Sequence, residues 1–233
     1  MKIKNVEKSS TVDYPPYISA VVFISGCNFR CPFCYNKELV DENSILPDIP
    51  KDEFLEWLIT RQGKLDSVVI TGGEPTIHGD ELVRFIRDIK DLGFKVKLDT
   101  NGSNPQIIRK LLDQKLIDYI AMDVKSDLLG YDKACGVTVS MYDIILSIAM
   151  IMSGEIPYEF RTTVVPGIHD EQTLKNIGQI IKGSKKYALQ QFKPINTLDP
   201  EFEKTKPFSD KDLEDVKESY EELKTAAEIE FRR

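Results

Sequence analysis

Residues 18–34 read ISAVVFISGCNFRCPFC, and this stretch determines how the rest of the chain is interpreted. Its first half, residues 18–24, is an apolar run of strand length, as in a strand that is buried on both faces. Cys27, Cys31 and Cys34 follow that run directly. In α/β proteins the reactive groups gather at the carboxyl ends of parallel strands. The stretch therefore predicts a buried strand that leads into a functional loop.

Outward from this stretch, strand-like and helix-like segments alternate along the chain. The predicted strands are residues 18–24, 67–71, 95–100, 119–123, 158–165 and 187–192, and the predicted helices lie at 53–59, around 82–89, from 105, at 141–152, after Asp170 and after Ser209. Asp170 and Ser209 are expected to cap their helices, and Leu223 is expected on the buried face of the last helix. Six such units imply a parallel sheet with right-handed crossovers. A closed barrel needs eight, so we predict an α/β fold, a partial (β/α)6 barrel, in a single domain over residues 1–233.

Composition and charge exclude several classes of protein. The net charge is −7, and no stretch is rich in Lys and Arg without interleaved acids, which argues against a nucleic-acid partner. No apolar run is long enough to span a bilayer, and the N-terminus lacks the apolar core of a signal peptide. We therefore expect a cytoplasmic protein with no membrane partner. Thiols stay reduced in the cytoplasm, so the four cysteines are expected to be ligands or core thiols rather than disulfides.

The three clustered cysteines have the spacing C-x3-C-x2-C. Thiolates are soft ligands that suit iron–sulfur clusters and zinc, and three ligands on a four-iron cluster leave one iron open for a small chelating molecule. Structural zinc usually takes four protein ligands, but no second C-x2-C pair exists and the chain has only two histidines, His78 and His169. A zinc-stabilised interaction module remains the non-enzyme alternative. Cys135 stands alone and is expected to be a buried core thiol.

Polar residues stand where the predicted strands end, so they are expected to converge on one mouth. They are Thr71-Gly72-Gly73-Glu74, Asp99-Thr100-Asn101, Asp123 with Lys125, Pro166 with His169, and Lys193. Asp99 and Asp123 would repel each other unless a cation or a hydrogen-bond donor lies between them. Arg161 follows Phe160 in an otherwise apolar strand and should meet a carboxylate or a ligand, with Asp13 as a candidate partner.

These motifs resemble those of a known family. Residues 27–34, with the aromatic Phe33 just before the third cysteine, resemble the signature of the radical S-adenosylmethionine superfamily, and TGGEP at 71–75 resembles its second motif. Four further segments resemble the activating enzymes of glycyl-radical enzymes, best those of anaerobic ribonucleoside-triphosphate reductases: 11–15 (TVDYP), 98–102 (LDTNG), 121–125 (AMDVK) and 161–167 (RTTVVPG). The similarity covers roughly residues 9–195.

The resemblance implies a mechanism and its cofactors. Cys27, Cys31 and Cys34 would hold a 4Fe–4S cluster whose open iron is chelated by S-adenosylmethionine. Reductive cleavage would give a 5′-deoxyadenosyl radical, which takes a hydrogen atom from a glycine of a partner glycyl-radical enzyme. The electron donor would be a flavodoxin or a ferredoxin. Since such chemistry needs no general base, neither histidine is assigned as one, and both are expected on loops.

The resemblance also implies roles for individual residues. Those that would contact the cofactor are Phe33, Tyr35, Gly72, Gly73, Glu74, Asp99, Asn101, Asp123, Lys125 and Lys193; Asp99, Thr100 and Asp123 would hold a monovalent cation; and Asp13 and Arg161 would position the substrate's glycine loop. The chain departs from the family at Tyr35, where many members carry His, at Pro16, where Gly is common, and at Lys193, near a His of the pyruvate formate-lyase activators. Two alternatives therefore stay open: an activase of the pyruvate formate-lyase type, and a radical enzyme acting on a small molecule, such as a deazaguanine synthase.

Overall fold

One eight-stranded sheet organises the chain, of which the computed structural model describes residues 1–222 and 225–232. The strands are β1 (Ile3–Ser10), β2 (Ser19–Ile24), β3 (Ser67–Gly72), β4 (Lys95–Thr100), β5 (Tyr119–Asp123), β6 (Tyr158–Val164), β7 (Ser184–Gln191) and β8 (Ala226–Arg232). The helices are α1 (Lys51–Ile59), α2 (Asp80–Asp91), α3 (Pro105–Asp113), α4 (Tyr131–Cys135), α5 (Met141–Ser153), α6 (Glu171–Ile180) and α7 (Asp210–Glu222), with short 3-10 turns η1 (Lys37–Leu39), η2 (Pro75–His78) and η3 (Pro200–Lys204).

The strands follow one another in sequence order across the sheet. β2 to β8 are parallel, and β1 is antiparallel to β2. β1 and β8 are its two edges, so the sheet is curved but not closed. The prediction of an α/β partial barrel with a parallel sheet is confirmed, with β2 to β7 as the six predicted strands. The single domain over residues 1–233 stays a prediction.

Two strands, β1 and β8, were not predicted, because charged residues interrupt their apolar pattern. β1 contains a buried lysine, Lys4, whose ammonium pairs with Asp48 at 2.6 Å and donates to two loop carbonyls. In β8 the partly buried Ile229 and Phe231 alternate with charged residues, which is a period-two pattern that the sequence interpretation overlooked. Helix α4 was also missed, because five residues are too few to show helical periodicity.

The predicted helix caps can be checked directly. The Asp170 carboxylate accepts a hydrogen bond from the Thr173 amide at 2.8 Å, so this cap is confirmed. The Ser209 hydroxyl accepts from the Asp212 amide at 3.2 Å, and the Asp212 carboxylate accepts from the Ser209 amide at 2.8 Å. This reciprocal pair is a capping box, which satisfies two amides that the helix itself leaves unpaired. Leu223 lies outside the described residues.

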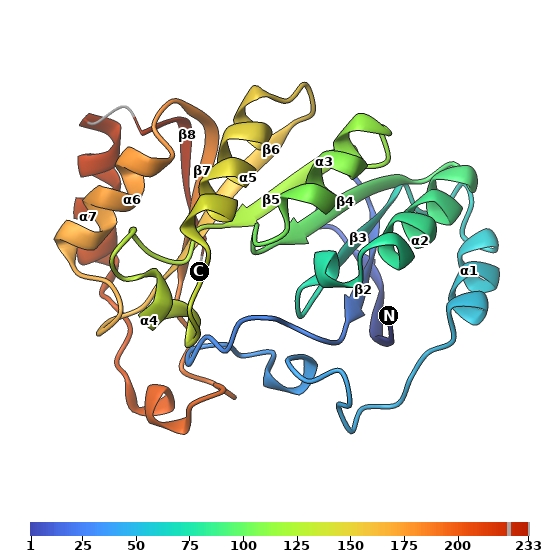
Figure 1. The fold of residues 1–233 in the computed structure, drawn as a ribbon, viewed down its shortest axis with the longest axis horizontal. Helices are drawn as coiled ribbons and strands as arrows, with labels where there is room; N and C mark the ends of the chain where they lie inside the picture. The colour runs from blue at the N-terminus through green and yellow to red at the C-terminus, as the bar shows by residue number, and fades with distance from the viewer. Residues whose placement is uncertain (223–224, 233) are drawn as a thin grey trace.

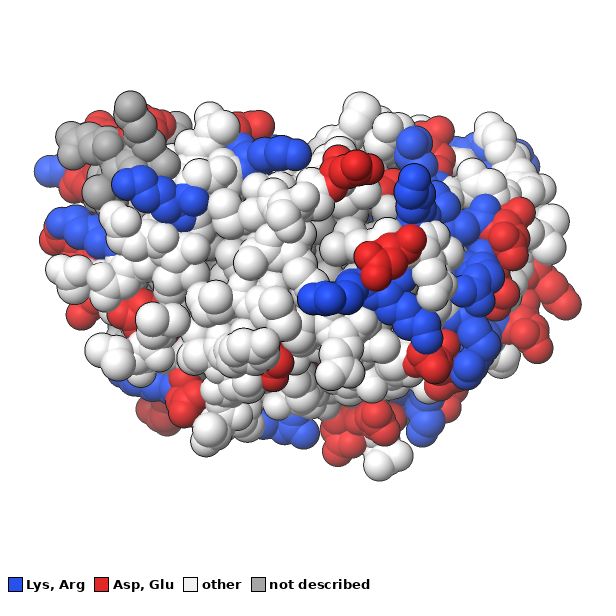
Figure 2. Space-filling model, turned by 45° about the horizontal axis from the view of Figure 1, so that its top comes forward, with Lys and Arg blue, Asp and Glu red and all other residues white. Residues whose placement is uncertain are grey.

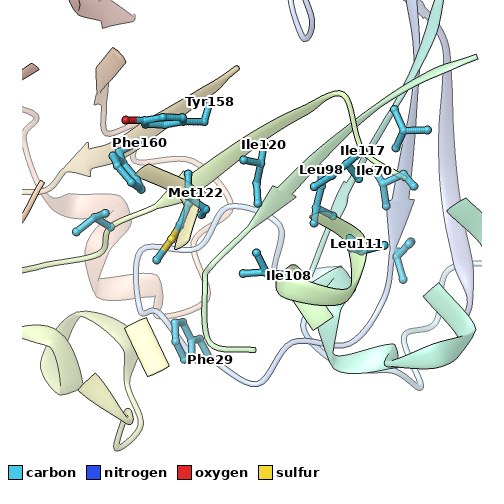
Figure 3. Packing of buried hydrophobic residues seen from close by; sticks show 14 of the residues in the cluster. Phe29, Ile70, Leu98, Ile108, Leu111, Ile117, Ile120, Met122, Tyr158 and Phe160 are labelled. Carbon is cyan, nitrogen blue, oxygen red and sulfur yellow. The ribbon is translucent and has the colours of Figure 1, made fainter. Parts of the chain in front are cut away.

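The two faces of the sheet have opposite character. Helices cover the outer face (Figure 1), and there Ile70, Leu98 and Ile120 of three neighbouring strands pack with Ile108 and Leu111 of α3 (Figure 3); all five are fully buried. Burial of each such side chain contributes about 1.5–3 kcal/mol to stability. The inner face instead carries charged side chains from β4, β5 and β6. A smaller apolar cluster, Tyr14, Val21 and Val69, also lies apart from the main core. The charged side chains are thus gathered on the inner side of the sheet, beside the site.

The outer surface shows charges of both signs. In the view of Figure 2, lysines and arginines are interleaved with aspartates and glutamates. Among the described residues, no helix is both long and apolar enough to cross a membrane.

Candidate active site

A cavity of about 440 Å³ opens at the carboxyl ends of the strands, and its size is in the range of cofactor sites. It brings together almost all the residues predicted from sequence: Asp13, Cys27, Cys31, Phe33, Cys34, Tyr35, Gly72, Gly73, Glu74, Asp99, Thr100, Asn101, Asp123, Lys125 and Arg161. Lys193 is exposed and does not line the cavity, so the geometry gives its predicted cofactor contact no support. Pro166 and His169, which were also expected at this mouth, do not line the cavity either. Sequence reasoning missed Phe23, Phe29, Thr163 and Gln190, which also line it.

The cysteine loop is held at several points by backbone hydrogen bonds. The amides of Gly26 and Cys27 donate to carbonyls of the segment at residues 39–40, at 2.8 and 3.0 Å. The Arg30 amide donates to the Cys135 carbonyl at 2.7 Å, and the Cys34 carbonyl accepts from the Leu198 amide at 2.9 Å. Two of these four bonds come from segments more than a hundred residues away, which local sequence could not reveal.

The donor set fits a four-iron cluster. Cys27, Cys31 and Cys34 line the same cavity, and a cubane binds each thiolate at a different iron, so its ligands need not meet at one point. The described residues contain no group of three His, Cys, Asp or Glu side chains that could hold one metal ion. Burial raises the pKa of the Cys27 thiol to about 12. Metal coordination removes such a proton outright, so a cluster held by this loop would be bound with release of protons.

Cys135 is fully buried, as predicted for a core thiol. It does not line the cavity, but it interacts with Cys31: hydrogen bonding from Cys135 lowers the pKa of the Cys31 thiol, and burial together with Cys31 raises that of Cys135. Its neighbour Gly136 adopts a φ of +65°, and a Cβ there would lie 2.2 Å from the Arg30 carbonyl oxygen. The end of α4 therefore packs closely against the backbone of the cysteine loop.

Gly72 and Gly73 stand where the backbone of another segment of this chain approaches too closely for a Cβ. A Cβ on Gly72, whose φ is +124°, would lie 2.3 Å from the Ile24 carbonyl oxygen, and one on Gly73 would lie 2.1 Å from that of Gly26. From the sequence we predicted that the space left by the missing Cβ lets a ligand approach the backbone. The structure shows that backbone of the first cysteine segment occupies that space, while both glycines still line the cavity. Their predicted contact with the cofactor stays a prediction.

Replacing Gly73 with Ala should destabilise the protein by about 1–3 kcal/mol, because backbone rather than a flexible side chain must move. The free energy of unfolding from urea denaturation measures the effect. Gly154→Ala is the matched control: the φ of Gly154 is −74° and the nearest atom to its Cβ is 3.3 Å away, so its change should stay within about 0.5 kcal/mol. Equal stability of the two variants would show that the close approach does not constrain this position.

Glu74 joins the ends of β3 and β4. Its buried carboxylate accepts hydrogen bonds from the Thr76 amide at 3.0 Å, the Thr100 hydroxyl at 2.7 Å and the Asn101 amide. Burial outweighs these bonds and raises the pKa of Glu74. The Asn101 side chain then donates to Asn28 in the cysteine loop at 3.0 Å. The Glu74 carboxylate therefore connects the segment after β3 to the end of β4, and Asn101 connects the end of β4 to the cysteine loop.

The two carboxylates predicted to repel each other are bridged by Arg161. Its Nε donates to Asp123 at 2.7 Å and its guanidinium NH1 to Asp99 at 3.1 Å. Burial would raise the pKa of Asp123, but Arg161 and then Lys125 outweigh it and lower that pKa well below its usual range. Lys125 itself donates to Asp123 at 2.9 Å. The prediction that a donor or cation lies between the acids is confirmed, and the donor is Arg161.

The monovalent cation stays a prediction. Arg161 already bridges Asp99 and Asp123, and the hydroxyl of Thr100 donates to Glu74. A cation on these three residues would require Arg161 to move away from the two acids.

Asp13 is not the ion-pair partner of Arg161 in the structure. Its carboxylate accepts from the Ser10 hydroxyl, while its backbone carbonyl accepts from Lys97 at 2.6 Å. Lys97 also lies 3.3 Å from the second oxygen of Asp99. Asp13 is therefore connected to Arg161 through Lys97 and Asp99. Sequence reasoning missed Lys97, although it lies two residues before Asp99 and thus on the same face of β4.

The remaining predicted residues are placed as follows. Phe33 is buried beside the cysteines, whereas Tyr35 is 57% exposed on the cavity rim. His169 lies on a loop, as predicted. His78 ends the 3-10 turn η2 rather than lying on a loop, and its Nε2 donates to the Ser25 carbonyl at 2.9 Å.

Comparison with known proteins agrees with this geometry. Residues 21–178 match the Radical SAM superfamily. A Methanocaldococcus jannaschii protein named for glycyl-radical enzyme activation (MJ1227) is 36% identical over 209 residues, which cover 87% of this chain and 84% of that protein. Pyruvate formate-lyase-activating enzyme of Streptococcus mutans is 27% identical over 210 residues, covering 84% and 78%.

Solved structures share the fold. A domain of pyruvate-formate lyase-activating enzyme from Bacteroides vulgatus matches with a TM-score of 0.58 at 16% identity, covering 72% of this chain and 99% of that one. Streptococcus suis SuiB, bound to its precursor peptide SuiA, matches with a TM-score of 0.69 at 17% identity, covering 91% and 48%. The open parallel sheet, the cysteine loop and the extent of the sequence match lead to one conclusion: the chain belongs to the Radical SAM superfamily and, within it, to the family of glycyl-radical enzyme activating enzymes.

Proposed function

We propose that this radical S-adenosylmethionine enzyme installs a glycyl radical on an anaerobic ribonucleoside-triphosphate reductase. The observation that carries the proposal is that the three cysteines, Asp123, Lys125 and Arg161 line one cavity, although they come from the loop after β2, the end of β5 and the middle of β6. An open iron and a cluster of fixed charges beside it suit a zwitterionic, chelating cofactor.

Each part of the site has a task in this proposal. When bound, the cluster and S-adenosylmethionine supply a 5′-deoxyadenosyl radical, while the protein supplies orientation and excludes water. Lys125, whose side chain is only 17% exposed, stays protonated: burial lowers its pKa, but Asp123 and the neighbouring cysteines together raise it further. Its ammonium can bind the cofactor carboxylate. Asp13 and Arg161 lie on the same cavity and would hold the partner's glycine loop near the radical.

A second candidate partner is a pyruvate formate-lyase. Several relatives with 25–27% identity are named as pyruvate formate-lyase-activating enzymes, among them one from Staphylococcus aureus that covers 97% of this chain. Both candidate partners would receive the radical on a glycine, so the cavity alone does not separate them. Incubating the reduced enzyme with each partner and recording which one gains an EPR doublet near the free-electron g value distinguishes the two. A flavodoxin or a ferredoxin as electron donor is tested in the same assay.

Binding of S-adenosylmethionine should change the EPR spectrum of the reduced cluster, because the cofactor would occupy the open iron. Asp123→Ala and Lys125→Ala should weaken this change without lowering the iron content. The matched control is Lys90→Ala: Lys90 pairs with Asp118 at 2.7 Å, a similar ion pair that does not line the cavity. If all three variants bind the cofactor as wild type does, the assignment of Asp123 and Lys125 is wrong.

A further inference from the structure

Lys125 lies where the sheet stops supplying hydrogen-bond partners. Strand β5 ends at Asp123, and the Val124 amide still donates to the Arg161 carbonyl at 2.8 Å. At Lys125, side chains instead of neighbouring backbone are the hydrogen-bond partners. The Lys125 amide donates to the hydroxyl of Tyr131 at 3.3 Å, and the Lys125 carbonyl accepts from Nε2 of His169 at 2.8 Å. The peptide groups on both sides of Lys125 are therefore held by two buried side chains from outside the sheet.

The contacts of His169 determine its tautomer. The Val165 amide lies 2.9 Å from Nδ1, and since an amide can only donate, Nδ1 must be the acceptor. The proton therefore sits on Nε2, which donates to the Lys125 carbonyl. The ring is 3% exposed and both nitrogens are used, so His169 is a neutral, fully satisfied bridge. It connects the loop after β6 to the segment after β5, 44 positions earlier in the chain.

We propose that His169 is a positioning residue that fixes the Lys125 peptide and so directs the ammonium of Lys125 into the cofactor cavity. The inference rests on the proposed contact between Lys125 and S-adenosylmethionine. The Lys125 side chain has several rotatable bonds, and a fixed backbone limits where its ammonium can reach. His169 lies outside the cavity lining, so it acts through Lys125 and not on the cofactor.

The bond from Nε2 to Lys125 survives a second proton. Burial lowers the pKa of His169 below its usual value near 6.5, so the ring is neutral at pH 7.5. The nearby charges are Asp127 and Asp170, which raise that pKa, and Lys125, which lowers it. A second proton would go to Nδ1 and break the bond from the Val165 amide, while Nε2 would still donate to the Lys125 carbonyl. The hold on Lys125 is therefore tested by substitution and not by acid.

Two substitutions separate the two bonds of the ring. His169→Asn can place its amide oxygen near the position of Nδ1 and so keep the bond from Val165, but it is too short to reach Lys125. His169→Gln can place an NH₂ group near the position of Nε2 and keep the bond to Lys125. The measurement is the dissociation constant of S-adenosylmethionine for the cluster-loaded protein, from EPR titration of the reduced cluster at pH 7.5. Iron content and thermal melting temperature are recorded beside it.

We expect His169→Asn to bind S-adenosylmethionine about three- to tenfold more weakly at pH 7.5, as expected for one lost hydrogen bond, with unchanged iron content. His169→Gln should bind as wild type does at the same pH, because it keeps the bond to the Lys125 carbonyl. Wild-type affinity in His169→Asn, or equal loss in both variants, would overturn the proposal. If His169→Asn does not fold, His169→Gln decides: wild-type affinity supports the bridge, and a threefold or greater loss overturns it.

Failure of this inference differs from failure of the proposed function. If Lys125→Ala weakens binding but His169→Asn does not, only the positioning role of His169 falls. If wild type shows no perturbation of its cluster by S-adenosylmethionine, the proposed function falls with it.

Discussion

Cys31→Ala should leave the reconstituted protein without an iron–sulfur cluster, whereas wild type should bind about four iron and four sulfide per chain. The reason is the size of the ligand set: the cavity offers three cysteines, and a cubane that loses one of three protein ligands has two exposed irons. Cys27→Ala and Cys34→Ala should have the same effect. Iron and sulfide analysis after anaerobic reconstitution, with the broad brown absorption that dithionite bleaches, measures the result.

Cys135→Ala is the matched control for this experiment. Cys135 is as buried as any residue of the core and interacts with Cys31, but it does not line the cavity. Its variant should therefore keep the cluster, although the removal of a buried side chain costs some stability. Stoichiometric zinc without sulfide in the wild type would contradict the cluster and would favour the zinc-stabilised module instead.

Much of the fold could be predicted because local patterns and global topology agree. The apolar run before Cys27, the capping residue Asp170 and the alternation of strands and helices each pointed to the same parallel sheet, and all three are present. Parallel topology also made the site predictable. Once Asp99 and Asp123 are placed at the ends of neighbouring strands, their side chains must share one edge of the sheet.

The rest depends on contacts between distant segments. The charged residues of β8 find their partners only in three dimensions, in Lys186 of β7 and Glu159 of β6. The partner of Arg161 was uncertain because several acids lie within reach of the same mouth, and only three-dimensional distances select Asp99 and Asp123 over Asp13. Gly72 shows a similar limit: its sequence context predicts close approach, but not whether a ligand or the chain itself approaches.

Arg161→Ala should abolish transfer of the radical to the partner enzyme while slow, uncoupled cleavage of S-adenosylmethionine continues. The guanidinium has five N–H donors, and the hydrogen bonds to Asp123 and Asp99 account for two of them. The others can bind backbone carbonyls of a glycine loop that enters the cavity. The glycine hydrogen must come within near-contact distance of the radical, so loss of this grip should reduce transfer far more than cleavage.

The variant should remain folded, which makes the test informative. Without Arg161, Asp99 keeps Lys97 at 3.3 Å and Asp123 keeps Lys125 at 2.9 Å, so neither acid is left without a cation. The readout is the EPR doublet on a glycyl-radical reductase from the same cell, with 5′-deoxyadenosine measured in parallel. Arg161→Lys should give an intermediate result, because it keeps the charge but loses the planar fork.

Arg87→Ala is the surface control, since Arg87 is exposed on α2 and its side chain donates to Gln114. It should transfer the radical as wild type does. The open edge between β1 and β8 is the reason to expect a protein partner at all, because a loop that carries its own backbone needs a groove wider than the mouth of a closed barrel. If 5′-deoxyadenosine formation instead becomes coupled to a small molecule, and no candidate reductase or formate-lyase gains a doublet, this open side serves another purpose and the proposed partner is wrong.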